Sequence, residues 1–427
     1  MSSTWIGILL LVSFIIMIVY LVRGGNPVLT MIVMAVLWAV LGGYNFNEVI
    51  TNVFQGTIEN YAGTIMTIVF GAWFAQVIVQ TGIASSLIRS AVELGGDKPG
   101  IVVTLIMIVV GFLFTSMFGV GPTIAVGVIV LPIMMSMGIS TRIAVAALTI
   151  PVGLASGINI AQYQVVSAFF DEGVATFGSP YLPYGYVAFG IGLVISIFIL
   201  CFQLKKGKEN RAWAVANYER EQTAKVKWYA YLTPLVPVLV VMILKWSIYP
   251  AFILGILYAL LTTYKKGTKP FNTASKAFCD GLSDSGGMIL FFLCAFAFAD
   301  SAKLVTPILG NLLTPILPKS MLVLVIFCAV LIPLVVYRGP MCLVGAGIAV
   351  YSTLLAAGNI SPVFIWVVAY SMETLHYYLD PTNSTVVWAM GYTKLKPIEY
   401  LKTAVPIGWI VGAVCLFVAY FMVRGLV

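Results

Sequence analysis

Charged residues are scarce in this chain: they make up 9% of its 427 residues, whereas 61% are hydrophobic. A soluble domain carries far more ionic residues on its surface, so the composition excludes that class. Histidine is almost absent, with His376 as the only one, and the six cysteines are scattered without a Cys-x-x-Cys pair. The sequence therefore indicates neither disulfides nor a metal centre, and it argues against a redox or zinc protein.

Motifs for nucleotide use and for covalent catalysis are missing as well. The chain has no glycine-rich phosphate loop and no Gly-x-Ser-x-Gly elbow, so ATP-driven transport and hydrolase chemistry have no residues to support them. We predict that it is not an enzyme and that it needs no cofactor beyond a coupling ion, H⁺ or Na⁺. The net charge of +8 does not indicate nucleic acid, because the basic residues can be placed on membrane faces.

Long apolar stretches are abundant, and about 20 apolar residues suffice for one span. They predict an all-α polytopic membrane protein with about ten transmembrane helices, located in a bacterial-type cytoplasmic (inner) membrane. The first stretch, Trp5 to Leu21, has no basic region or cleavage site and is expected to be a span rather than a signal peptide. The expected helices lie near residues 4–22, 27–43, 62–81, 142–173, 184–203, 228–245, 249–264, 286–300, 361–391 and 404–423.

Two further apolar stretches, 101–139 and 320–358, are interrupted at their centres by the same frame, Gly-Pro-x-x-x-Val-Gly, beginning at Gly121 and Gly339. Each stretch is long enough for two spans. Because the break leaves only one or two residues for a turn, we predict instead two re-entrant hairpins whose half-length arms meet near the midplane. Backbone inside a bilayer must satisfy its own hydrogen bonds, so a matched pair of breaks is typical of a transporter binding site.

Two of the expected helices, 142–173 and 361–391, are predicted to be broken by polar segments at 157–164 and 378–385. Asp380 is expected to cap a half-helix that starts with proline and continues from Thr382. The hairpin prolines are likewise expected at the first position of an outgoing helix, where the missing N–H costs nothing. Free amides at these helix starts attract anions, and free carbonyls at the ends of the incoming arms suit Na⁺.

The distribution of basic residues predicts the topology. If each hairpin enters and leaves the membrane on its own side, 18 of the 23 basic residues fall on one face and Lys245, Lys303, Lys319 and Arg424 on the other. The positive-inside rule makes the first face cytoplasmic and both termini extracytoplasmic. The two hairpins then enter from opposite sides, so the halves are inverted in topology.

Three matched elements in matched order support two repeats: the segments 54–59 and 278–284, the two hairpins, and the two polar breaks. We therefore predict a first repeat at 1–203, with hairpin 101–139 and broken helix 142–173. A second, inverted repeat follows at 228–427, with hairpin 320–358 and broken helix 361–391. The basic linker 204–227 between them is expected in the cytoplasm, either lying on anionic lipid or binding a partner.

This organisation resembles the ion transporter superfamily, which includes gluconate permeases, citrate and C4-dicarboxylate carriers and divalent-anion/sodium symporters. The architecture matches over nearly the whole chain, but the shared motifs are short. The Ser-Asn-Thr signatures of the symporters are not reproduced, and the nearest approach is Thr382-Asn383-Ser384-Thr385. The layout is nearest to the gluconate permease and citrate carrier branches. That resemblance implies a small organic acid moved with a cation by an elevator-type homodimer, which is joined through helices near 4–43 and 228–264.

Arg338, directly before the second Gly-Pro, is the one basic residue expected at mid-membrane, where burying a guanidinium costs roughly 2.5–3.5 kcal/mol. It must pair either with a substrate carboxylate, held bidentately, or with Glu373 or Asp380 in an internal ion pair. Both can hold if substrate competes with an acidic residue for the arginine.

Glu373, His376 and Asp380 are spaced i, i+3, i+7 and share one helical face. A carboxylate–imidazole–carboxylate stripe can relay or store a proton, since histidine titrates near neutrality. The alternative is a hydrogen-bonded packing network between helices. We assign proton or cation coupling to Glu373, His376, Asp380, Ser384 and Thr385.

The first half has uncharged polar residues at the equivalent depth. They either orient substrate and Na⁺ or form hydrogen bonds between helices. The candidate Na⁺ ligands are Thr115, Ser116, Asn159 and Asn383. The candidate substrate-binding residues are Arg338, Gly339, Met341, Gly121, Thr123, Ser116, Asn159, Gln162, Thr382 and Asn383.

Three functions remain open. The first is a cation-coupled symporter of a small organic acid anion, and its single arginine favours a monoanion or an acid bound by one carboxylate. The second is the membrane subunit of a carrier that needs a separate substrate-binding protein. The third is an ion antiporter or channel in which Glu373 and Asp380 bind cations directly and Arg338 balances their charge.

Overall fold

A computed structural model describes residues 3–170, 181–206, 226–265, 267, 269–313 and 317–426. Every regular element in these ranges is helical, as the apolar composition predicted. Most of the predicted linker 204–227, and the end of the predicted helix 142–173, lie outside the described residues.

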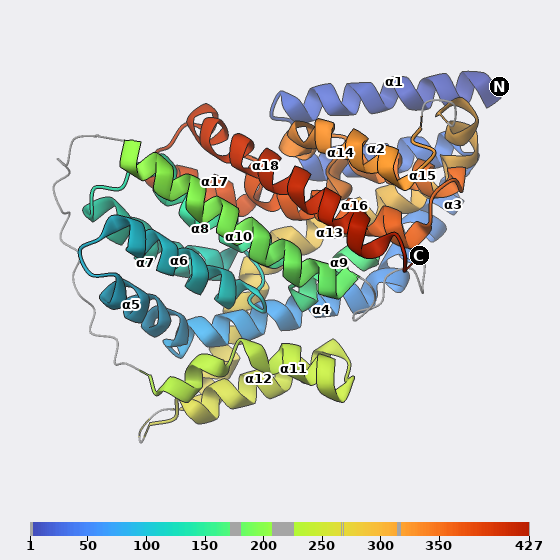
Figure 1. The fold of residues 1–427 in the computed structure, drawn as a ribbon. Helices are drawn as coiled ribbons and strands as arrows, with labels where there is room; N and C mark the ends of the chain where they lie inside the picture. Colours follow the sequence, from blue (N-terminus) through green and yellow to red (C-terminus); the bar gives the residue numbers. More distant parts are fainter. Residues whose placement is uncertain are drawn as a thin grey trace.

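Two helix pairs lie at the periphery of the molecule. The first is α1 (Ser3–Val22) with α2 (Pro27–Leu41), which starts at the cap Asn26 and has proline at its first position. The second is α11 (Leu235–Leu244) with α12 (Ile248–Thr262), preceded by the short 3₁₀ turn η2 (Trp228–Leu232). Figure 1 shows α1 at one edge and the α11–α12 pair at the opposite edge. Large apolar side chains on these helices remain exposed, Ile16 and Leu261 among them, as expected for lipid-facing surfaces.

Two long helices run between these edges and pack against each other. A short helix α3 (Phe46–Glu48) and a π-helical turn η1 (Val49–Gln55) lead directly into α4 (Gly56–Gln80). Its partner α13 (Pro270–Leu313) has 44 residues, which corresponds to a length of about 66 Å, roughly twice the hydrocarbon thickness of a bilayer. The predicted spans 62–81 and 286–300 are therefore pieces of longer helices. The prediction took only the apolar run, whereas α13 continues on both sides of that run through segments that carry charged residues.

The two predicted hairpins are both interrupted helical pairs, but they differ. In the first, α6 (Pro99–Phe114) and α7 (Val120–Ser136) are in contact and are joined by residues 115–119. Their 16 and 17 residues exceed half a span. The prediction that Pro122 is the first helical residue is wrong: α7 begins at Val120, so Pro122 is the third residue of the helix.

The second hairpin has shorter and less regular arms. It comprises α14 (Met321–Leu331), a 3₁₀ segment η3 (Ile332–Arg338), a π turn η4 (Leu343–Gly347) and α15 (Ile348–Ala357). The prediction that Pro340 starts a helix is wrong, because residues 339–342 form a turn. Within this tip Tyr337 and Arg338 have φ of +55° and +51°, a left-handed conformation that costs a non-glycine residue roughly 1–2 kcal/mol.

Both predicted helix breaks are present. Helices α8 (Thr141–Ser156) and α9 (Ile160–Ser167) meet at a bend of 61°, and α16 (Pro362–Leu379) is followed after four residues by α17 (Ser384–Thr393). Asparagine caps the second half-helix in each case: Asn159 caps α9 and Asn383 caps α17. The prediction that Asp380 caps a half-helix from Thr382 is wrong, since Asp380 ends α16.

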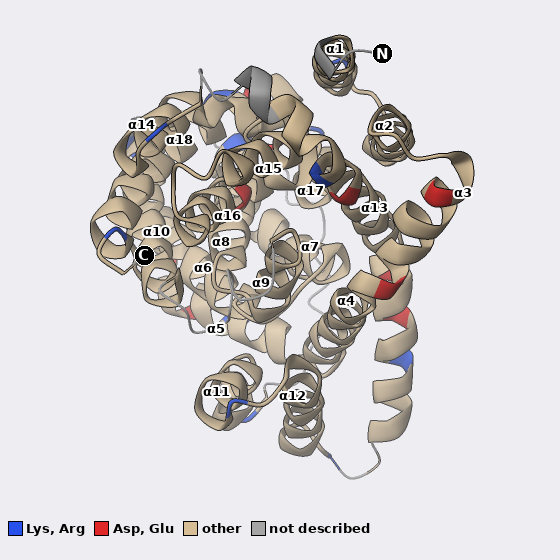
Figure 2. Cartoon of the chain, turned by 90° about the vertical axis from the view of Figure 1, so that its right-hand side faces the viewer, with Lys and Arg blue, Asp and Glu red and all other residues tan. Residues whose placement is uncertain are grey.

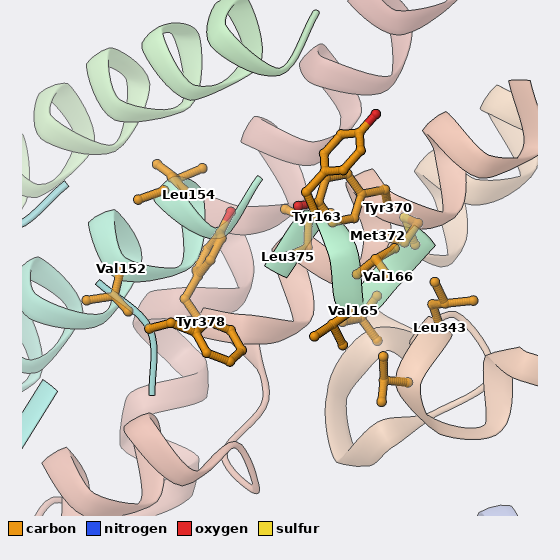
Figure 3. Close-up of a cluster of buried hydrophobic side chains, with 14 of the residues drawn as sticks. Val152, Leu154, Tyr163, Val165, Val166, Leu343, Tyr370, Met372, Leu375 and Tyr378 are labelled. Atoms are coloured by element: carbon orange, nitrogen blue, oxygen red, sulfur yellow. The ribbon is translucent and has the colours of Figure 1, made fainter. Parts of the chain in front are cut away.

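The broken helices form the centre of the molecule. Helix α16 packs on α8, and both contact α18 (Pro397–Val423). Helix α10 (Tyr181–Lys206) packs on α8 and α18, α6 packs on α8, and α5 (Ile83–Gly95) packs on α6. Figure 3 shows apolar side chains of α9, α16 and η4 gathered in one cluster. Its aromatic part includes Tyr163, whose ring centroid lies 5.8 Å from that of Tyr370 and 5.1 Å from that of Trp366. This packing holds the short α9 against α16.

Five helices of the described chain are long and apolar enough to cross a membrane, and α8–α9 makes a sixth if the bent pair counts as one span. Shorter apolar helices of 10–17 residues, including α2, α11 and α12, would have to supply the rest of the predicted ten. The chain is a multi-pass membrane protein. In Figure 1 both termini lie toward one end, whereas α10 finishes at the other; the assignment of these ends to membrane sides stays a prediction.

Candidate functional site

A cavity of about 110 Å³ lies where both breaks and both hairpin tips meet α13. Seven predicted residues reach it, and they come from both halves of the chain. They are Asn159, Arg338, Glu373, His376, Asn383, Ser384 and Thr385. The rest of the wall comprises Phe114, Met117, Phe118, Gly119, Val120, Val152, Ser156, Gly287, Met288, Phe291, Phe292, Val344 and Tyr377.

Asn159 fixes the first break against the tip of the first hairpin. Its side-chain oxygen accepts hydrogen bonds from the amides of Ala161 at 2.9 Å and Gln162 at 3.1 Å. Its side-chain nitrogen donates to the carbonyls of Phe114 and Met117, both at 2.9 Å. The carboxamide is thus saturated by backbone, and its placement at the cavity wall is structural in this conformation.

Asn383 has the same capping position in the second half but is bound less completely. Its oxygen accepts from the amide of Thr385 at 3.0 Å. Its side-chain nitrogen has no hydrogen-bond partner among the described residues, and the residue lines the cavity. A polar group of a solute can therefore bind here.

The two asparagines provide a matched pair for a stability test. We expect Asn159→Ala to lower the free energy of unfolding by about 2–4 kcal/mol, because it removes a helix cap and leaves two buried carbonyls unpaired. Asn383→Ala should lose the cap alone, about 1 kcal/mol. Thermal unfolding of both purified variants in detergent measures the difference, and equal losses would contradict the anchoring role of Asn159.

Asp380 joins the second break to the second hairpin, and its side chain is fully buried. One oxygen, Oδ1, accepts from the amide and hydroxyl of Thr382, both at 2.7 Å. The other, Oδ2, accepts from the backbone amide of Arg338 at 2.8 Å. Asp380 and Thr382 do not line the cavity. Asp380 instead holds the backbone of the second hairpin tip in place through the amide of Arg338.

Glu373, His376 and Asp380 lie on one face of α16, as their spacing predicted. Glu373 Oε1 is 3.3 Å from His376 Nδ1, and His376 Nε2 is 3.1 Å from Asp380 Oδ2. Glu373 Oε2 also accepts from the amide of Val344 at 2.9 Å. Both carboxylates therefore have partners within the protein. Glu373 is buried, whereas Figure 2 shows that many of the charged residues lie toward the outside of the bundle.

The Arg338 side chain reaches the cavity from the second tip. Nη1 donates to the carbonyl of Val344 at 3.2 Å, and the guanidinium carbon lies 4.1 Å from the ring centre of Phe291. No described carboxylate is within ion-pair distance of the guanidinium, and Nε is buried without a hydrogen-bond partner. The predicted internal ion pair with Glu373 or Asp380 is thus absent from this conformation of the described chain. The guanidinium retains donors for a ligand.

The other predicted residues lie around the cavity without lining it. Gln162 contacts the cavity-lining residue Tyr377: its Oε1 accepts a hydrogen bond from the Tyr377 hydroxyl, and its Nε2 has no hydrogen-bond partner. Ser116 is buried with an unpartnered hydroxyl, whereas Thr115 and Thr123 donate to carbonyls of their own helix turns. Gly121 lies in the first turn of α7, and Gly339 and Met341 lie in the turn of the second hairpin tip.

The sequence reasoning missed the contribution of α13. Phe291, Phe292 and Met288 form an apolar side of the cavity. The only feature of the sequence that could have indicated this wall is the Gly286-Gly287 pair, because two glycines without side chains leave space on the surface of a helix. An aromatic residue that lines a cavity cannot be told by sequence from one that packs in the core of an apolar span.

Comparisons with known proteins identify the fold but no family. No protein-family model matches the chain, and no curated protein matches it. Among solved structures, it is similar to the YdaH transporter of Alcanivorax borkumensis, whose crystal structure revealed an unusual topology. The TM-score is 0.58 at 14% sequence identity, over 94% of this chain and 98% of that chain. The chain shares the fold of that membrane transporter.

Proposed function

We propose that the protein is a secondary active transporter of a small organic acid anion, coupled to H⁺ or Na⁺. The observation that carries the proposal is Arg338, whose guanidinium lines the cavity with a buried unpartnered Nε while the nearby carboxylates are bound elsewhere. A buried donor of this kind is costly unless a ligand pairs with it. A carboxylate is the ligand whose geometry fits a guanidinium.

The form of the cavity restricts the substrate. Arg338 is the one arginine or lysine among the described residues that line it, and Phe291 and Phe292 supply an apolar wall. Asn383 and Ser384 offer polar groups on another side. This combination favours a monoanion, or a polar acid bound through one carboxylate, with hydroxyls that meet the α17 cap.

The charges around the cavity give a reason for coupling. Arg338 contributes +1, and Glu373 and Asp380 contribute −1 each, so the site has a formal charge of −1 when His376 is neutral and 0 when His376 is protonated between the two carboxylates. A substrate anion makes that charge one unit more negative unless a proton or Na⁺ binds as well. Anion and cation should therefore bind cooperatively, and this linkage is reciprocal.

The architecture supports the transport mechanism. Both halves contain a peripheral pair, a long helix, an interrupted hairpin, a broken helix and a final long helix in the same order. We propose that they are inverted repeats and that the broken elements move as a unit against α1–α4 and α11–α13 in an elevator-type homodimer. The fold likeness to a transporter supports this class, and membership of the ion transporter superfamily remains part of the proposal.

A ligand screen on the purified chain tests the function. Small carboxylic acids are screened for thermal stabilisation with and without Na⁺ at two pH values, because a bound ligand raises stability by mass action. We expect one acid class to stabilise the protein, more strongly with the coupling ion present. If Na⁺ or pH alone shifts a well-folded protein and no acid does, the anion proposal fails in favour of an antiporter.

Uptake by the chain alone in proteoliposomes is the second part of the test. Accumulation of the acid found in the screen, driven by an imposed ion gradient, is expected without any added protein. Binding without uptake would indicate a membrane subunit that needs a separate substrate-binding protein.

A further inference from the structure

Cys342, Glu373 and His376 form a compact cluster between the second hairpin tip and α16. The Sγ atom of Cys342 lies 3.5 Å from Glu373 Oε2, and Glu373 Oε1 lies 3.3 Å from His376 Nδ1. One donor atom from each residue lies within 4.8 Å of the other two, and all three side chains are buried. These are a thiol, a carboxylate and an imidazole, three side-chain types that ligate transition metals.

The spacing of the donors suits a tetrahedral ion. Zinc binds sulfur at about 2.3 Å and nitrogen or oxygen at about 2.0–2.1 Å. In a tetrahedron these bond lengths place neighbouring donors roughly 3.3–3.6 Å apart. The separations of 3.5 Å from Cys342 Sγ to Glu373 Oε2 and of 3.3 Å from Glu373 Oε1 to His376 Nδ1 lie in this range. They involve different carboxylate oxygens, and the three ligand atoms lie within 4.8 Å of one another, so side-chain rotations are needed to close the donors around one ion.

Residues behind the cluster hold its members in position. His376 Nε2 is 3.1 Å from Asp380 Oδ2, and Asp380 is itself held by the amides of Arg338 and Thr382. Glu373 accepts from the amide of Val344. A carboxylate behind a ligating histidine is the usual support of a metal site, because it orients the ring and raises its basicity.

The histidine supplies an independent indication of a missing ligand. His376 is 2% exposed, yet neither ring nitrogen makes a hydrogen bond of good geometry, despite the short distances to both carboxylates. A buried imidazole without such a bond is costly. An ion at Nδ1 would remove the cost on that side, and a small ring rotation would align Nε2 with Asp380.

We propose that Cys342, Glu373 and His376 bind a divalent transition metal ion of the zinc class. Glu373 and His376 also line the cavity, so water or a solute can fill the fourth position from that side. Binding replaces the Cys342 S–H bond by a metal–sulfur bond and releases the thiol proton to solvent. The ion joins the hairpin tip to α16 and occupies two residues assigned to coupling, so it should inhibit transport.

The sequence argued against a metal centre because its six cysteines are scattered without a Cys-x-x-Cys pair, and Cys342 is 31 positions from Glu373. The hairpin turn brings the thiol to α16, which a spacing rule does not reveal.

Cobalt binding tests the proposal without a substrate, and therefore independently of the proposed function. The chelator-treated full chain in detergent is titrated with Co²⁺ while thiolate-to-cobalt charge-transfer absorption is recorded. We expect one Co²⁺ ion per chain, bound with release of a proton from the Cys342 thiol and then displaced by Zn²⁺ without further proton release. Cys342→Ser should abolish the absorption, and Cys328→Ser, which changes another fully buried cysteine, should preserve it.

Two further variants keep the test decisive if Cys342→Ser folds poorly. His376→Gln should lose the Co²⁺ spectrum, and Asp380→Asn should weaken binding roughly 10- to 100-fold. A well-folded parent that binds no Co²⁺, or an unchanged spectrum in His376→Gln, overturns the metal site. Acid binding in the screen above is unaffected by that outcome, so failure of one proposal is distinguishable from failure of the other.

Discussion

Replacement of Arg338 by alanine is expected to weaken binding of the substrate acid by roughly 10- to 150-fold, the effect of losing a charge-assisted hydrogen bond worth about 1.5–3 kcal/mol. The fold should persist, because the structural contact of this residue to Asp380 is made by its backbone amide. Isothermal titration with the acid identified by the screen measures the loss.

Two other variants make the result specific. Arg338→Lys keeps the charge but loses the planar pair of donors, so it should recover only part of the affinity. Arg424→Ala removes an arginine that also stacks on aromatic rings, Tyr420 and Phe421, at the end of α18, and it should bind acid normally. Undiminished binding by a folded Arg338→Ala protein would remove the central support for an anion carrier.

Glu373→Gln is expected to separate binding from coupling. Glutamine preserves an acceptor for the amide of Val344 and removes one negative charge beside His376. Acid affinity should remain, and exchange of acid between compartments of equal pH should continue. Uptake driven by an imposed proton gradient should fall to background, because the stripe then has one less titratable carboxylate.

The measurement compares gradient-driven uptake and equilibrium exchange in the same proteoliposomes. Glu399→Gln, at an exposed position in the first turn of α18, is the control and should behave as the parent. A pH dependence that is unchanged in Glu373→Gln would contradict proton coupling and direct attention to Na⁺.

The sequence predicted those parts of the fold that depend on local chemistry. The Gly-Pro frames located both interrupted hairpins, and the polar segments located both helix breaks, because glycine, proline and asparagine act on the backbone next to them. The face shared by Glu373, His376 and Asp380 followed from helical periodicity alone.

What the sequence did not reveal depends on contacts between distant segments. The stacking of Arg338 on Phe291 of α13, and the approach of Cys342 to α16, arise when separate elements pack together. The cap of the second half-helix was wrongly predicted to be Asp380, and not Asn383, for a related reason. Asp380 and Asn383 are both good capping residues, and Asp380 is instead bound to Arg338 on another element.

The conformation of the second hairpin tip has a mechanical consequence. Tyr337 and Arg338 are held in a left-handed backbone conformation that costs roughly 1–2 kcal/mol each, whereas the first tip is fastened by Asn159 through two backbone carbonyls. The first tip is therefore held rigidly by hydrogen bonds, whereas the second is held in a strained backbone conformation. A movement that relaxes Tyr337 and Arg338 would return part of that energy, so opening of the site should begin at the second tip.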